Sequence, residues 1–110
     1  MKKPILIIEK DNISHPFKVL LSLDGYPVEV TQGISTNIEA EKYSLLITSD
    51  RYLINNYDKI RNFNIPFLVV SSNGNTLQDH IIKTARHAHI LNSPVDFKQF
   101  RTTVRELTGA

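Results

Sequence analysis

The composition limits the chain to a few classes of protein. Its 110 residues correspond in size to one domain with a single hydrophobic core. The absence of cysteine excludes disulfide bonds, thiolate catalysis and thiolate metal sites, and it suits a cytosolic protein. The net charge of +2 is small and the basic residues are scattered, so nucleic-acid binding is not favoured. No apolar run reaches membrane-spanning length, and we expect a cytoplasmic protein with residues 1–110 as a single domain.

The predicted elements alternate between strand and helix along the chain. Short apolar runs predict five strands, whose expected positions are residues 5–8, 28–30, 45–47, 67–70 and 90–91. Ile13, Phe17 and Leu21 lie at helical spacing and predict a first helix, in which Pro16 is tolerated because it lies in the first turn. Further helices are expected over residues 35–42, 51–62 and 77–88.

The last helix has the clearest boundaries in the sequence. An apolar stripe predicts its buried face, which comprises Phe97, Phe100, Val104 and Leu107. Asp96 is the expected N-cap, with Gln99 at capping-box spacing, and Gly109 is expected to end the helix.

Strands that alternate with helices indicate an α/β protein, a three-layer sandwich whose parallel sheet is covered by helices on both faces. In such folds ligands bind at the carboxyl ends of the strands, near the point where the strand order reverses. The candidate site residues are therefore those that end or follow the expected strands. They are Glu9, Lys10, Asp11, Thr48, Ser49, Asp50, Ser71, Ser72, Asn92, Ser93 and Pro94.

The ordered set of strand ends resembles the receiver domain of bacterial two-component response regulators, over essentially the whole chain. Residues 23–28 are similar to the Gly-Tyr-x-Val entry to that family's second strand, and residues 65–72 are similar to its fourth strand. Ser71 and Ser93 are 22 positions apart, the spacing between the family's hydroxyl and lysine positions. The resemblance implies a flavodoxin-like fold with a five-stranded parallel sheet in the order 2-1-3-4-5.

The acidic corner of the site departs from the family. A working receiver domain uses a pair of acids to hold Mg²⁺, which prefers oxygen ligands. In this chain the matching pair is Glu9-Lys10, and an ammonium group repels a divalent cation. We expect Lys10 to act as an internal counter-ion among Glu9, Asp11 and Asp50, in place of the metal. The simpler alternative is an exposed lysine that contributes little.

The residues at the positions that accept and bind the phosphoryl group also differ from those of the family. In the family an aspartate accepts the phosphoryl group, and a hydroxyl and a lysine bind its oxygens. By the resemblance, the acceptor position is Ser49 and the lysine position is Ser93, followed by Pro94 with an expected cis bond. Ser71 retains the hydroxyl, and Ile90 replaces the family's switch aromatic.

These substitutions predict a phosphorylation-independent receiver domain that serves as a protein-interaction module in bacterial signal transduction, without enzymatic activity or a cofactor. Two alternatives remain open. In one, Asp50 accepts phosphate and the domain uses Mg²⁺. In the other, Ser71, Ser72 and Ser93 bind a small anion or another small molecule.

The partner is predicted to be another protein, a fused output domain or a second copy of the chain, and not a membrane. The resemblance implies that it docks on the last two helices, whose basic residues include Lys83, Arg86, His87, Lys98, Arg101 and Arg105. Since Asp79, Asp96 and Glu106 are interspersed among them, a solvated mixed face is the alternative. The spacing of His80, His87 and His89 favours surface histidines over a metal site.

Overall fold

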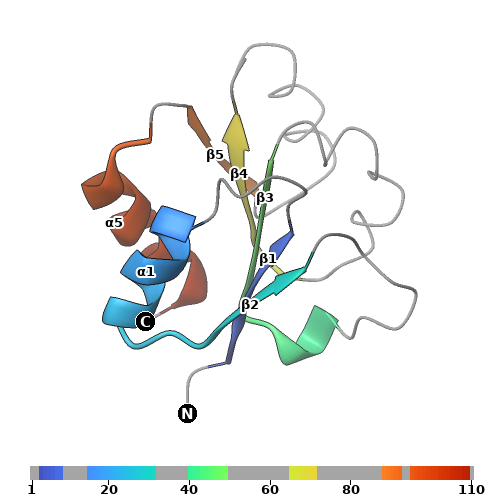
Figure 1. Ribbon diagram of the computed structural model, residues 1–110. Coiled ribbons are helices and arrows are strands. Elements are labelled where there is room, and N and C mark those ends of the chain that lie inside the picture. Colours follow the sequence, from blue (N-terminus) through green and yellow to red (C-terminus); the bar gives the residue numbers. More distant parts are fainter. Residues whose placement is uncertain are drawn as a thin grey trace.

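A parallel sheet organises the protein. The computed structural model describes residues 3–8, 15–31, 40–49, 65–71, 88–92 and 95–109. Within these residues five strands form one sheet in the order β2-β1-β3-β4-β5, which confirms the predicted topology (Figure 1). Their bounds are β1 (Ile5–Ile8), β2 (Val28–Thr31), β3 (Leu45–Ser49), β4 (Phe67–Ser71) and β5 (Ala88–Asn92).

The central strands are buried on both faces. Every residue of β1 is buried, and so are the first four residues of β3. Because successive side chains of a strand point to opposite faces, the burial of both Leu46 and Ile47 means that the sheet is covered on each side. This explains why these strands are continuous aliphatic runs, and it agrees with the predicted three-layer architecture.

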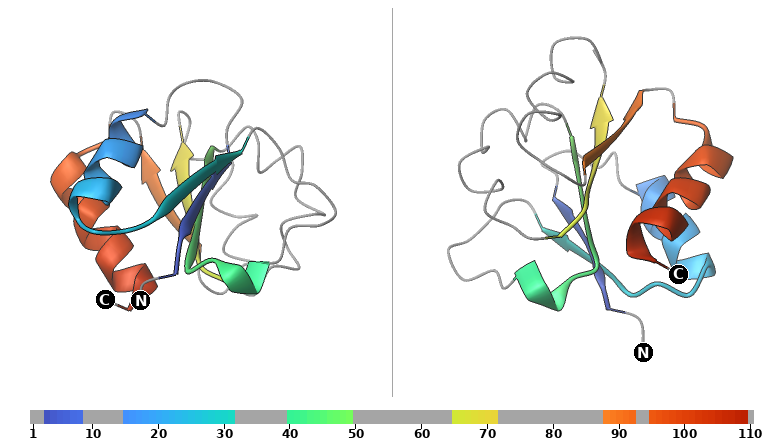
Figure 2. Two further views of the ribbon diagram at one scale, coloured as in Figure 1. Left: turned by 60° about the horizontal axis from the view of Figure 1, so that its bottom comes forward. Right: turned by 180° about the vertical axis from the view of Figure 1, so that it is seen from behind.

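Two helices, α1 (His15–Leu23) and α5 (Phe97–Thr108), cover the same face of the sheet, whereas the short 3₁₀ helix η2 (Ala40–Lys42) lies on the other side (Figures 1 and 2). Of the helix predicted over 35–42, only the part in η2 belongs to the described residues. The helices predicted over 51–62 and 77–88 lie outside them. No helix in the described ranges is long and apolar enough to cross a membrane.

The sequence explains both ends of helix α1. Pro16 occupies the first turn, as predicted, where its missing N–H removes no helical hydrogen bond. At the other end, the backbone N–H of Tyr26 donates to the Leu21 carbonyl oxygen at 3.0 Å. Gly25 has a φ of 88°, a conformation that glycine adopts without steric cost, and the chain turns there into β2.

Helix α5 begins and ends where the sequence predicts. The Asp96 carboxylate accepts hydrogen bonds from the backbone N–H groups of Lys98 and Gln99, at 2.9 and 3.4 Å. At the far end Gly109 adopts a φ of 72° and caps the helix.

The predicted apolar stripe of α5 is wrong at one position. Phe97 is 48% exposed, whereas Thr103 is buried. Phe97 lies in the first turn, and its ring packs on Phe17 in a T-shaped arrangement, with ring centroids 6.3 Å apart.

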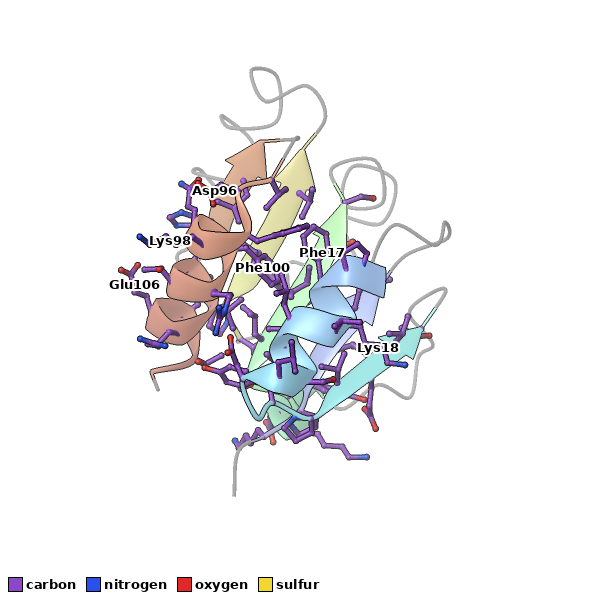
Figure 3. The ribbon with its side chains drawn as sticks, turned by 60° about the vertical axis from the view of Figure 1, so that its left-hand side comes forward. Phe17, Lys18, Asp96, Lys98, Phe100 and Glu106 are labelled. Atoms are coloured by element: carbon purple, nitrogen blue, oxygen red, sulfur yellow. The ribbon has the colours of Figure 1, made fainter. Side chains whose placement is uncertain are left out.

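Aromatic packing and an ion pair join the two helices. The Phe17 ring stacks on the fully buried Phe100, with centroids 4.6 Å apart, and Figure 3 shows the two rings between the helices. Beside them the Arg101 guanidinium donates two hydrogen bonds to the Asp24 carboxylate, at 2.9 and 2.5 Å. Since Asp24 directly follows α1, this fork fixes the turn after α1 against α5.

Candidate functional site

The carboxyl ends of the strands form the candidate site. Ile8 of β1 pairs with Thr48 of β3, and Ser49 pairs with Val70 of β4. These two register pairs place the end of β3 between the ends of β1 and β4. Strands β1 and β3 are neighbours although β2 separates them in sequence, so the strand order reverses between them. Ser49 therefore lies at the point of the sheet where ligands bind in this class of fold.

The last two residues of β3 differ in their surroundings. Thr48 is buried, and its hydroxyl donates to the carbonyl oxygen of Ile8 at 3.3 Å. This bond satisfies the hydroxyl inside an apolar layer and ties the end of β1 to β3. Ser49, the next residue, is partly exposed at the carboxyl-terminal end of this central strand. The sequence analysis placed Thr48 among the strand-end candidates, but it did not predict the bond to Ile8.

The chemistry of Ser49 does not fit the family's reaction. A serine hydroxyl is neutral at physiological pH and cannot replace an ionised carboxylate as the phosphoryl acceptor. It is also a poor substitute for the carboxylate ligands that Mg²⁺ prefers, so the end of β3 does not fit a magnesium site. The residues in the described ranges contain no group of three or more His, Asp or Glu side chains that could hold a metal ion.

Ser71 and Asn92 lie on neighbouring strands. Ser71 of β4 pairs with Asn92 of β5, so the backbone brings the residues that end these strands to one edge of the sheet. This juxtaposition was expected from the parallel sheet and from the resemblance to receiver domains. Several candidate residues lie outside the described ranges: Glu9, Lys10, Asp11, Asp50, Ser72, Ser93 and Pro94. The Lys10 counter-ion and the cis bond before Pro94 stay predictions.

The predicted switch position lies within β5. Ile90 pairs with Val69 and is partly exposed. An aliphatic side chain there has no hydroxyl to exchange hydrogen bonds with a strand-end group. His89, its neighbour, is exposed, which agrees with the prediction of a surface histidine.

Half of the predicted docking residues are described by the structure. Lys98, Arg101 and Arg105 are exposed on α5, whereas Lys83, Arg86 and His87 lie outside the described ranges. Arg101 is held by Asp24, whose hydrogen bonds and charge raise the pKa of the guanidinium. Its charge is therefore paired within the domain with Asp24, an acid that was not among those the sequence analysis placed beside the basic residues.

A second electrostatic contact lies near the opposite end of the sheet. The Tyr43 hydroxyl hydrogen-bonds to the Glu29 carboxylate, and this bond, partial burial and the carboxylate charge raise the pKa of Tyr43 to about 12. Tyr43 precedes β3, so the pair joins the chain before β3 to the edge strand β2 and is remote from Ser49.

Solved structures of receiver domains are similar to this chain in fold. The chain superposes on a signal receiver domain of two-component signal transduction from Clostridium thermocellum with a TM-score of 0.77 at 15% identity, covering 100% of both chains. It also matches a response regulator receiver protein from Burkholderia phymatum, with a TM-score of 0.73, 13% identity, and coverage of 97% of this chain and 96% of the other. This chain has the fold of a response regulator receiver domain.

A third solved structure with a similar fold comes from another organism. A response regulator receiver domain protein from Methanospirillum hungatei gives a TM-score of 0.71 at 15% identity, covering 99% of this chain and 95% of the other. No model of a known protein family matches the sequence, and no curated protein is significantly similar to it. The receiver likeness is therefore carried by the backbone and by the ordered strand ends, at identities too low to transfer a residue's role.

Proposed function

We propose that the chain is a phosphorylation-independent receiver domain, a non-catalytic protein-interaction module in signal transduction that acts in the cytoplasm. The observation that carries the proposal is Ser49 at the end of β3, beside the point where the strand order of a receiver fold reverses. A hydroxyl there cannot form the acyl phosphate on which receiver switching depends. The partner is another protein, a fused output domain or a second copy.

The surrounding substitutions support the same function. Lys10 follows Glu9 where a second metal-binding acid is expected, and Ser93 stands where a lysine is expected. Each change removes a charge needed to hold Mg²⁺ or phosphate. Ile90 removes the aromatic hydroxyl that would carry the signal to the surface. Because the sheet and its hydrophobic core are retained, the role that remains for such a domain is to bind another protein.

Intact-mass measurement after treatment with a small acyl phosphate and Mg²⁺ tests the proposal. We expect no added phosphoryl mass, under conditions in which a receiver domain with an acceptor aspartate is modified. A phosphoryl adduct that is lost in Asp50→Asn would contradict the proposal and establish the alternative, in which Asp50 is the acceptor.

A further inference from the structure

The turn after α1 contains a dipeptide that is prone to rearrange chemically. Asp24 is followed by Gly25, and no other aspartate of the chain precedes a glycine. Glycine has no side chain to hinder the approach of its backbone nitrogen to the preceding carboxyl carbon, so this dipeptide readily forms a cyclic succinimide. Gly25 is exposed, and water reaches its N–H group. The turn precedes β2 and lies at the end of the sheet opposite Ser49, apart from the candidate site.

Helix α5 restrains the Asp24 carboxylate. Nε and Nη2 of Arg101 donate to its two oxygens, at 2.9 and 2.5 Å. This fork fixes the orientation of the carboxyl group, and a rotation toward the Gly25 nitrogen breaks at least one of the bonds. The guanidinium also favours the ionised carboxylate, which nucleophiles attack less readily than the neutral acid. The fork therefore opposes cyclisation through both geometry and charge.

The attacking nitrogen is restrained by the turn itself. The Gly25 N–H donates to the Ser22 carbonyl oxygen at 3.1 Å. The nitrogen must lose this proton in order to attack, and hydrogen-bonded protons exchange with solvent more slowly. This bond is local, whereas Arg101 is 77 positions from Asp24. Of the two restraints, the fork is the one that depends on the contact with α5.

We propose that Asp24 is a site of aspartate isomerisation whose rate is set by the Arg101 fork. The Gly25 nitrogen forms a bond to the side-chain carboxyl carbon of Asp24, and the amide proton and the carboxyl hydroxyl leave as water. Water then adds to one ring carbonyl and breaks its bond to nitrogen. Opening at the main-chain carbonyl gives isoaspartate, and opening at the side-chain carbonyl restores aspartate. A water leaves and a water returns, so the mass is unchanged and no oxidant or reductant is needed.

Isomerisation removes the restraint that slows it. In isoaspartate the main chain runs through the former side chain, and the carboxylate is attached directly to Cα. The carboxylate then reaches less far toward Arg101, and the lengthened main chain displaces the N–H groups of Gly25 and Tyr26 from their acceptors in α1. We expect the isomerised protein to lose the fork and to melt at a lower temperature. Its content of isoaspartate therefore reports the time for which the fork has been open.

Peptide mapping after incubation of the folded protein, at a temperature below its melting transition, tests the proposal. The isomerised peptide separates from the parent peptide at the same mass, whereas deamidation at Asn73-Gly74 changes the mass. We expect Arg101→Gln to isomerise at Asp24 about fivefold faster than the parent protein, because the fork no longer holds the carboxylate. Lys98→Gln is the control, since it removes the same charge from α5 and leaves the fork in place. Equal rates in Arg101→Gln and either the parent or Lys98→Gln would overturn the proposal.

Two comparisons separate the fork from unfolding. Asp96→Ala removes the N-cap of α5 but retains the fork, so it should isomerise at the parent rate. Acceleration by Asp96→Ala equal to that by Arg101→Gln would attribute the reaction to unfolding and overturn the proposal. In urea the fork is absent, and we expect the parent and Arg101→Gln to isomerise equally, at least about tenfold faster than the folded parent. A folded parent protein that isomerises as fast as the unfolded chain would also overturn it.

The nature of the restraint is tested by a conservative variant and by salt. Arg101→Lys retains the charge but not the fork, and it should isomerise faster than the parent protein. A rate equal to that of the parent would contradict the role of the fork. Salt screens the pair, so a high salt concentration should accelerate the parent protein and leave Arg101→Gln unchanged. Equal acceleration of both proteins would count against the ion pair as the restraint.

Discussion

The helical face of the sheet and the carboxyl ends of its strands are under different constraints. On the helical face, Phe17, Leu21, Phe100 and Val104 fill the space between α1, α5 and the sheet, and the caps and the Arg101–Asp24 fork fix both helices. At the strand ends, the structure retains the backbone geometry of a receiver fold, and in the proposed function Ser49 takes the place of the group that gives the geometry its chemistry. The comparison teaches that packing maintains a fold independently of the reaction that the fold can support.

The largest effect on the helical face is expected from Phe100→Ala. This side chain is fully buried and stacks on Phe17, so its removal leaves a cavity and should lower the free energy of unfolding by about 3–5 kcal/mol. Urea denaturation measures the change. Phe97→Ala is the matched control, because Phe97 contacts the same ring but is half exposed, and it should cost about 1 kcal/mol. Equal losses would contradict the difference between the two positions.

The N-cap of α5 should give the next largest effect. Asp96→Ala removes the carboxylate that accepts from the backbone N–H groups of Lys98 and Gln99, at an expected cost of about 1 kcal/mol. Asp96→Asn keeps an oxygen acceptor and should cost much less. If denaturation shows the same loss in both variants, the carboxylate charge and not the cap is what stabilises the helix.

The Tyr43–Glu29 contact predicts a change at alkaline pH. Because the folded state raises the pKa of Tyr43 from 10.0 to about 12, the stabilisation is complete below pH 10 and is lost as the pH rises to 12. The melting temperature should therefore fall less steeply between pH 10 and pH 12 in Tyr43→Phe than in the parent protein. Glu29→Gln should flatten the curve in the same way, and a slope unchanged by either variant would count against the contact.

The Arg101–Asp24 fork predicts the smallest effect. Arg101 is exposed, and water and salt screen such pairs, so Arg101→Gln should lower the melting temperature slightly at low salt and by less at high salt. Lys98→Gln removes the same charge one turn away, without a described ion pair, and serves as the control. A difference between the two variants that does not depend on salt would argue against an electrostatic contribution.

Much of the helical face could be predicted from the sequence. The aliphatic runs, Pro16, Asp96 and Gly109 each have a local physical meaning, and together they give the strands, the first and last helices, and both ends of α5. The strand order came from the resemblance and not from periodicity. The exposure of Phe97 could not be predicted, because helical spacing alone does not show how much of its ring Phe17 covers.

The candidate site was less predictable for a different reason. The parallel sheet and the resemblance placed Ser71 beside the end of the next strand, and the structure confirms this through its pairing with Asn92. The Asp24–Arg101 fork was missed, because its partners are 77 positions apart and nothing in the local sequence links them. The bond of Thr48, a strand-end candidate, to β1 was missed for the same reason, since its hydroxyl bonds to a strand that begins 43 positions earlier.

The central claim is that the strand ends retain the receiver geometry without binding a phosphoryl group. Its most direct test is the melting temperature with Mg²⁺ and beryllium fluoride, a mimic of the phosphoryl group that would stabilise any folded domain that binds it. We predict the same melting temperature with and without the two reagents, in the parent protein and in Asp50→Asn. A rise of several degrees in the parent protein that Asp50→Asn abolishes would contradict the claim.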